Sequence, residues 1–455
     1  MRARSLILVV VIVFGTVLGV SSAAVALPQV PSSAFMPVTG CGCHSGLIED
    51  WQVSMHAKAL EDPIYQYKLD EANRATGGAL GEYCNSCHGP VAVMSGEIAN
   101  LDAATQQSRE AVMCDFCHQV TGTNTPLGNV SQTLNPDGTK RAQFADSVSP
   151  FHATAYSGFH ETAEFCGACH NVDHPVNGMH LEATYTEWQN GPYAAEGIQC
   201  QDCHMTPGPG VTKPYPGTAA GGGVQREHIY LMTFAGGNVA LGDSVRAEER
   251  LKAAASLELE VPEIVAPGET VQLTTSITNV GAGHYLPTGL TEVRQMWLEV
   301  KAVYPDGAEE VLGRHDFGTV LKDAEGNAPV ELWDAVDFES DDRIPPRETV
   351  TDTFEFTMPE GGEAEIQAAL YYRSCSEEMA EGAGVDVPTT TMVSAASGVY
   401  GDEGLRADAL AREGGDAGSN GLMLGIALAG LAVAMGIIGL AGVRSRKSKT
   451  AESQE

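Results

Sequence analysis

The pentapeptide Cys-x-x-Cys-His occurs four times in the first half of this 455-residue chain, at residues 84–88, 114–118, 166–170 and 200–204. Two thiols on one helical turn can add to the two vinyl groups of a haem, and the adjacent histidine can then bind its iron. Zinc and redox C-x-x-C pairs are the alternative, but neither needs histidine at the next position. Chance would place it there four times on the order of once in a million. The motifs therefore predict four covalent haems. The predicted thioether residues are Cys84, Cys87, Cys114, Cys117, Cys166, Cys169, Cys200 and Cys203, and the predicted iron ligands are His88, His118, His170 and His204.

A fifth, irregular motif precedes these four. In Cys41-Gly42-Cys43-His44 the two cysteines are one residue closer together than in the regular motifs. Cys43 can form one thioether while His44 binds iron, and Cys41 then lies at the wrong offset for the second vinyl group. A disulfide or a free thiol pair beside an ordinary histidine is the alternative. We expect a fifth haem here, which leaves Cys41 free to pair with Cys375, the one cysteine outside the first half.

The chain has enough histidine for each iron to receive a second axial ligand. It contains 13 histidines, of which five belong to the motifs. A neutral imidazole elsewhere in the same region is the ligand expected on the other side of an iron. The candidates are His56, His152, His160 and His228, with His284 reaching across from the second half of the chain. A plain loop residue is the alternative for His284. We expect His174 and His180 to be loop residues and His315 to be a surface residue.

The sequence after the first motif resembles a known family. Residues 51–57 read W-x-x-S-x-H-A and lead to C-x-x-C-H-G at 84–89, and residues 185–188 and 193–197 form a second matching stretch before the motif at 200–204. In these features residues 40–240 resemble the multihaem c-type cytochromes that include the tetrahaem partner of hydroxylamine oxidoreductase. The resemblance implies an electron-transfer protein and marks His56 as an iron ligand. The chain departs from the family at its shortened first motif. Residues 279–289 look like part of the β domains appended to such cytochromes.

Composition divides the exported part of the chain into two regions. Residues 27–250 contain ten of the 11 cysteines and show little strand-like alternation, which predicts a haem-packed domain of short helices and loops. From Ser256 apolar residues alternate with polar ones, as at Leu257, Leu259 and Val261. Residues 251–375 therefore predict an all-β, immunoglobulin-like sandwich. Residues 376–420, rich in Gly, Ala, Ser and acids, predict a flexible acidic stalk. The expected fold class is mixed.

Both ends of the chain carry targeting patterns. Residues 1–26 read as a signal peptide cleaved after Ala26, with an uncleaved anchor as the alternative. Residues 421–443 lack charge and predict a transmembrane helix, and the basic residues in 444–455 place the tail in the cytoplasm. A sorting signal that is later removed is the alternative. We expect an exported protein anchored in the cytoplasmic membrane, with its haem domain outside.

The net charge and the absence of catalytic motifs limit the classes of function that we expect. The formal net charge is −33, which disfavours nucleic acid and favours redox partners with basic docking faces. Small-residue pairs in 421–443 allow self-association. No catalytic triad, phosphate loop or paired-acid motif is present, so no catalytic residue is predicted. We expect a membrane-anchored electron relay. The alternatives are a multihaem oxidoreductase acting on a small nitrogen or sulfur compound and a subunit of a surface cytochrome filament.

Overall fold

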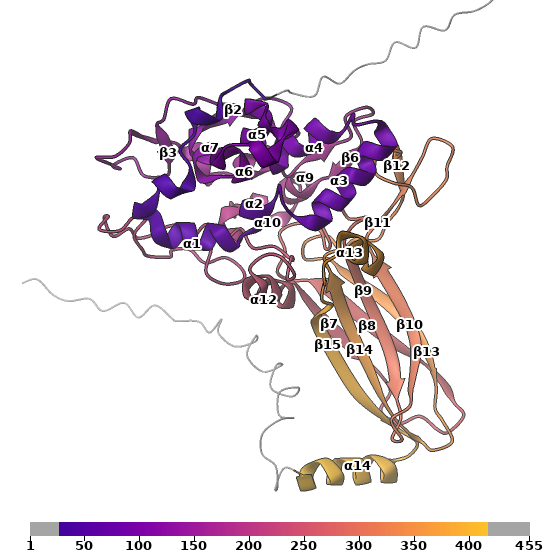
Figure 1. Cartoon of the computed structure of the whole chain (residues 1–455). Helices are drawn as coiled ribbons and strands as arrows, with labels where there is room; N and C mark the ends of the chain where they lie inside the picture. Colours follow the sequence, from indigo (N-terminus) through magenta and orange to yellow (C-terminus); the bar gives the residue numbers. More distant parts are fainter. Residues whose placement is uncertain (1–26, 417–455) are drawn as a thin grey trace, which may run out of the picture.

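The computed structural model describes residues 27–416, and it has a helical N-terminal region followed by a region rich in β-strand (Figure 1). The two regions lie end to end, with the β-strands extending away from the helices. This agrees with the predicted change in composition near residue 250. Within residues 27–416 no helix is both long and apolar enough to cross a bilayer. The predicted signal peptide and membrane helix lie outside the described residues.

The N-terminal region is built from short helices joined by long loops. Its α-helices are α1 (Ser45–Val53), α2 (Met55–Lys58), α3 (Pro63–Thr76), α4 (Gly81–His88), α5 (Pro90–Ser95), α6 (Gln106–Arg109), α7 (Cys114–Gln119), α8 (Ala163–Gly167), α9 (Thr184–Gln189), α10 (Pro192–Ala195), α11 (Gln201–His204) and α12 (Ser244–Ala254). Its 3-10 helices are η1 (Ser32–Ala34), η2 (Val38–Gly40), η3 (Gly42–His44), η4 (Glu97–Ala99), η5 (Leu101–Ala103) and η6 (Gly158–Glu161). The motifs at 84–88, 114–118 and 200–204 lie largely on helices α4, α7 and α11. The motif at 166–170 starts in the last turn of α8.

The longest of these helices, α3, shows how local sequence sets the boundaries. Asp62 accepts hydrogen bonds from the backbone N–H groups of Ile64 (2.8 Å) and Tyr65 (3.4 Å), and Pro63 occupies the first helical position. An N-cap carboxylate and a first-turn proline both favour a helix start. Gly77 ends the helix in the left-handed conformation (φ 64°), which glycine adopts without steric cost. The helix therefore holds Tyr65 and Lys68 in fixed positions beside α4.

Small two-stranded sheets fasten the loops of the N-terminal region. The pairs are β1 (Val120–Thr123) with β2 (Gln132–Leu134), β3 (Lys140–Ala142) with β4 (Thr154–Tyr156), and β5 (Val172–Asp173) with β6 (His180–Glu182). The β5–β6 pair follows the motif at 166–170 directly and places Glu182 opposite Val172.

The C-terminal region consists of two antiparallel sheets that share one core. One sheet has the order β13-β8-β7 and the other β10-β9-β14-β15. The strands are β7 (Ala255–Glu260), β8 (Thr270–Asn279), β9 (Gln295–Val303), β10 (Glu309–Phe317), β13 (Thr349–Thr357), β14 (Glu363–Arg373) and β15 (Thr390–Tyr400), and β11 (Thr319–Lys322) pairs separately with β12 (Asp337–Asp341). Alternate residues such as Leu273 and Ile277 of β8 pack against Leu298 and Val300 of β9. This alternation is the period predicted from the sequence.

The predicted stalk over residues 376–420 is wrong for the part that the structure describes. Helix α13 (Glu377–Ala383) packs against α3, β15 pairs with β14 along its length, and α14 (Glu403–Asp416) follows at the far end of the β region (Figure 1). Met392 and Val399 of β15 enter the shared core. The Ser, Ala and Gly residues between them carry little hydrophobic signal, so cross-strand hydrogen bonding, which composition does not reveal, decides this segment.

Candidate haem sites

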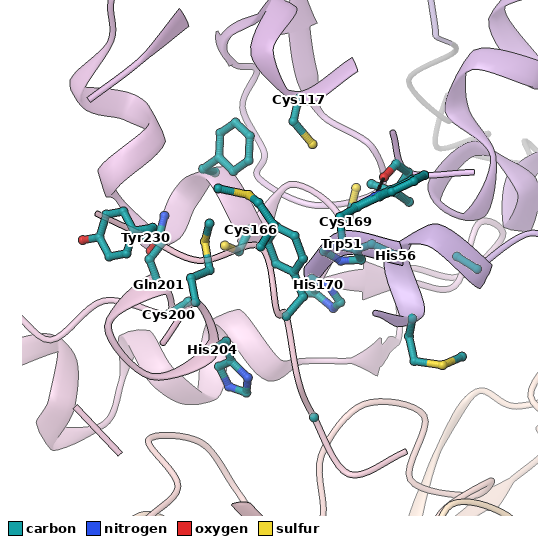
Figure 2. A pocket seen from close by; sticks show the side chains of 18 of the residues that line it. Trp51, His56, Cys117, Cys166, Cys169, His170, Cys200, Gln201, His204 and Tyr230 are labelled. Atoms are coloured by element: carbon teal, nitrogen blue, oxygen red, sulfur yellow. Dashed lines mark hydrogen bonds between the residues drawn. The ribbon is translucent and has the colours of Figure 1, made fainter. Parts of the chain in front are cut away.

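A continuous cavity of about 1850 Å³ runs through the N-terminal region and reaches the loop after β8. The cysteines and histidines of all five motifs line it, and so do His56, His152, His160 and His284. Figure 2 shows part of this cavity, where motif residues from α7, α8 and α11 converge with His56 of α2. The motifs that are far apart in sequence therefore form one connected set of sites, which we name by their motif histidines.

Each motif histidine has its Nδ1 atom hydrogen-bonded to an acceptor. The acceptor is a backbone carbonyl at four sites: Ala219 for His44 (2.7 Å), Ala59 for His88 (2.9 Å), Arg141 for His118 (2.8 Å) and Ala235 for His204 (2.8 Å). At the fifth site the acceptor is the Glu182 carboxylate, 3.0 Å from Nδ1 of His170. An Nδ1–H held by an acceptor leaves the lone pair of Nε2 free for a metal.

Four motif histidines face a second histidine ring across the cavity. The ring centroids are 6.4 Å apart for His44 and His152, 6.2 Å for His170 and His56, 6.0 Å for His118 and His160, and 6.2 Å for His204 and His284. Two imidazoles on opposite sides of one metal, with bonds of about 2.0–2.1 Å, place their centroids about 6 Å apart. The spacing, with the motif thiols alongside, fits bis-histidine haem at these four sites.

His284 comes from the loop that follows β8, so the β region completes the His204 site. Asn279 holds this loop in place by donating from its amide to the His284 carbonyl (2.9 Å). The structure thus brings together four of the five predicted distal histidines with motif histidines.

His228, the remaining predicted distal ligand, lies elsewhere. Its Nδ1 accepts a hydrogen bond from the backbone N–H of Tyr215 (2.9 Å), and its ring stands edge-to-face on Tyr230 (4.6 Å). It faces no motif histidine, because the chain from 213 to 230 folds back on itself and keeps the ring in its own loop. The other histidines also lie away from the motif rings: His174 contacts Trp333, His180 pairs with Asp173, and His315 pairs with Asp352.

The His88 site differs from the other four. The aromatic ring packed on His88 is that of Tyr65, with centroids 3.6 Å apart and planes within 6°. This distance is face-to-face stacking, so Tyr65 flanks the imidazole and does not face it across a metal. The Tyr65 hydroxyl donates to Asn85 of the same motif (2.9 Å). Within residues 27–416 no histidine ring pairs with His88, so the structure supplies one histidine ligand here.

Burial favours the neutral form of His56, His160 and His204, which is the form that metal binding requires. Burial, together with neighbouring histidines, lowers the pKa of His56 to about 3 and those of His160 and His204 to about 4. Burial also disfavours protonation of His170, but the hydrogen bond and charge of Glu182 outweigh it and raise the pKa to about 9. His170 is therefore the motif histidine on which a carboxylate acts most directly.

The shortened motif places its two cysteines in different surroundings. Cys43 is exposed beside His44, whereas Cys41 is half-buried near Asp115 and Lys140, where burial raises its pKa. Cys375 is buried in a separate cluster with Ile64 and Val293. Both Cys41 and Cys375 are free thiols, so the suggested pairing of the two is wrong. They are far apart in sequence, and the fold places Cys375 among Ile64 and Val293 but Cys41 near Asp115 and Lys140.

Comparisons with known proteins bear on the motif region and on the fold. Residues 41–119 match the family described as cytochrome c554 and c-prime. The chain is similar to the penta-heme cytochrome c552 from Thermochromatium tepidum, with 21% identity and a TM-score of 0.60, over 81% of this chain and 100% of that chain. A CARDB domain from Pyrococcus furiosus matches 32% of this chain and 85% of its own length at 14% identity, with a TM-score of 0.18. No curated protein sequence matches.

The resemblance seen in the motif sequences is thus confirmed by the family match over residues 41–119. The shared fold with the penta-heme protein extends beyond that stretch into the β region. Taken with the four regular motifs and the histidine pairs, these findings make residues 41–119 of the chain similar to the cytochrome c554 and c-prime family, within a fold shared with a penta-heme cytochrome.

Proposed function

We propose that this protein is an electron relay that holds five haems and does not itself transform a substrate. The observation that carries the proposal is the set of four facing histidine pairs in one continuous cavity. Haem c held at these positions supplies an iron that takes up and releases one electron. Each facing pair would hold one haem iron between two imidazoles, which would suit electron transfer and would leave no open position for a substrate.

The sites form a branched row. The Cys87 and Cys169 thiols shift each other's pKa, and so do those of Cys166 and Cys200, which Figure 2 shows side by side. This mutual influence places the His170 site next to the His88 site and next to the His204 site. Cys169 also raises the pKa of Cys117 in the His118 motif, and His44 lowers the pKa of His118. The inferred order is His44, His118, His170, and then two branches.

A second candidate function rests on the His88 site. Because Tyr65 stacks on the face of His88, the motif histidine is the one imidazole that this site offers among the described residues. An iron with an open position can bind a small molecule. The alternative function is therefore an oxidoreductase that acts on a small nitrogen or sulfur compound at this branch.

The deciding experiment exposes the reduced, haem-replete protein to nitrite, hydroxylamine, nitric oxide and sulfite in turn. For a relay we expect no multi-turnover consumption of any of them, while a redox partner is reduced rapidly. Fast catalytic consumption of one of these compounds would rule out the relay function and support the oxidoreductase function. Tyr65→Phe, which keeps the stacked ring and removes the hydroxyl, is the matched variant for that outcome.

We also propose that the redox partner of this protein is basic. The net charge of −33 supports docking of a basic redox protein. The expected result is faster reduction of a basic than of an acidic single-haem cytochrome, with a difference that shrinks as salt is added.

The facing sheets β13-β8-β7 and β10-β9-β14-β15 support an immunoglobulin-like module. Its role here is to present His284 to the His204 site.

A further inference from the structure

The hydrogen bond between His170 and Glu182 sets one site apart from the other four. At the His44, His88, His118 and His204 sites the acceptor for Nδ1 is a neutral backbone carbonyl. At the His170 site it is a carboxylate. The five sites therefore differ in the charge of the group that accepts the hydrogen bond from Nδ1, which is negative at the His170 site and neutral at the other four.

Glu182 is held in this position by its own strand. It is the last residue of β6, and its backbone lies opposite Val172 of β5, two residues after His170. Its side chain is 18% exposed, and among the described residues its ion-pair partner is His170. No lysine or arginine in residues 27–416 forms an ion pair with this carboxylate. Its negative charge is thus directed at the imidazole and is not cancelled by a neighbouring cation.

A carboxylate in this position has a known direction of effect on a metal. It draws the Nδ1 proton toward itself and so makes Nε2 a stronger electron donor to the iron. The oxidised iron carries one more positive charge than the reduced iron. Both the donation and the nearby negative charge therefore stabilise the oxidised form, which makes one-electron reduction less favourable.

The His170 site is the one at which the row of haem sites splits into its two branches. The thiols of Cys169 and Cys87 shift each other's pKa, as do those of Cys166 and Cys200, which Figure 2 shows side by side, so the His170 site lies between the His88 and His204 sites. His56, which faces His170, has its pKa lowered by both His88 and His204 and so lies near both of them. A potential set at this site governs how electrons distribute between the two branches.

We propose that the Glu182 carboxylate lowers the reduction potential of the haem held by His170 and His56, making the branch site the most reducing of the bis-histidine sites. Glu182 is a positioning and tuning residue that acts through His170. The inference rests on the haem attachment in the proposed function and adds the order of potentials, which that proposal leaves open.

The test compares the wild type with Glu182→Gln and Glu182→Ala as haem-replete mature proteins. The glutamine oxygen can still accept the Nδ1–H but carries no charge, whereas alanine removes both. Asp173→Asn is the matched control, because Asp173 pairs with His180, which is not a motif histidine, on the same β5–β6 hairpin. Each protein is titrated with dithionite and ferricyanide at one pH, and the midpoints are read from the haem absorption bands.

We expect Glu182→Gln to raise one midpoint by about 59 mV or more, which is a tenfold change for one electron, while the others move less. Asp173→Asn leaves all midpoints in place. His56→Met identifies the site, because methionine ligation raises the potential of the same haem. If Glu182→Gln leaves every midpoint unchanged, Glu182 only orients the ring and the proposal is overturned. Intact mass tests the proposed function separately, because loss of haems would appear there and not as unchanged midpoints.

Discussion

Cys41 and Cys43 are two residues apart, yet their surroundings assign them different roles. Cys43 is exposed, and its carbonyl accepts a hydrogen bond from Gly221 (2.6 Å), in the segment that also supplies the Nδ1 acceptor of His44. Cys41 lies instead near Lys140 and near Asp115 of the motif at residues 114–118. The His44 site therefore has one thiol in position for a covalent bond.

Intact mass of the mature protein tests this assignment. The wild type and Cys41→Ser should both carry five haems, because Cys41 forms no thioether. Cys43→Ser should carry four, because the one covalent bond at the His44 site is lost. Cys41→Ser is the matched control for the chemistry of the substitution. A four-haem mass for the wild type would remove the His44 site from the relay.

Glu292 is a partly buried carboxyl in the segment between β8 and β9. One of its oxygens is buried without a hydrogen-bond partner. Burial raises its pKa from 4.5 to about 7, Lys68 and Arg294 oppose the rise, and Glu331 adds to it. A buried carboxyl with a raised pKa is more stable in its protonated form. The charge that appears on this group at higher pH therefore works against the folded state.

Glu292 should make the protein less stable as pH rises from about 4.5 to about 7. The folded state binds the proton more tightly than the unfolded state in this window, so the free energy of unfolding falls by up to about 1.4 kcal/mol per pH unit. Glu292→Gln removes this contribution and should be more stable than the wild type at pH 8, with little difference at pH 4.5. Thermal unfolding across this range measures it, and parallel pH curves for the two proteins would contradict it.

At the scale of elements, helix α9 and the loop after β8 hold the two regions together. Glu187 of α9 is buried and pairs with Arg343 in the loop after β12. Its other oxygen accepts hydrogen bonds from the Thr288 hydroxyl (2.7 Å) and the Tyr285 backbone N–H (3.1 Å). Tyr285 follows His284 directly. One buried carboxylate thus fixes the loop that supplies a distal histidine.

Glu187→Ala should destabilise the protein and loosen the His204 site. Removing Glu187 costs about 1–3 kcal/mol, because the Thr288 hydroxyl and the Tyr285 N–H lose their acceptor, while Arg343 keeps its pair with Asp341. With the loop released, the His204 haem should show increased high-spin character in its absorption spectrum. Glu196→Ala is the control, since its exposed pair with Arg347 also joins the two regions but is solvated and contributes little. Equal effects of the two substitutions would rule out a specific role for Glu187.

At the scale of the whole molecule, the haem sites occupy one end and the shared core of the β region extends from it (Figure 1). The β region therefore acts as a structural support that also completes one site. Residues 1–26 and 421–443 lie outside the described part, and the proposal that they export and anchor the chain rests on their sequence.

Protease treatment of intact spheroplasts tests this topology. We expect the haem region to be degraded and the C-terminal tail to be protected, because the signal peptide and the basic tail place them on opposite sides of the membrane. An epitope after residue 455 and the haem stain report on the two parts. Protection of the haem region in unbroken spheroplasts, with degradation after lysis, would reverse the topology.

The sequence alone determined the features that depend on short spacing. Attachment chemistry requires thiols and histidine within five residues, so the four regular motifs could be identified directly. The β region was predicted for the same reason, because alternation between neighbouring residues is local. The stalk was predicted incorrectly, because β15 is held by pairing with β14, whose residues lie well before it in the chain.

Only the tertiary structure decided which residues meet. His56 and His170 are more than 100 residues apart in sequence, as are the Nδ1 acceptor Ala219 and His44, and nothing in their local sequence specifies the pairing. His228 had the same local appearance as His160, but its loop directs it to Tyr230. Axial ligation and the charge next to each ligand depend on contacts between distant segments, and long-range packing, not local spacing, determines those contacts.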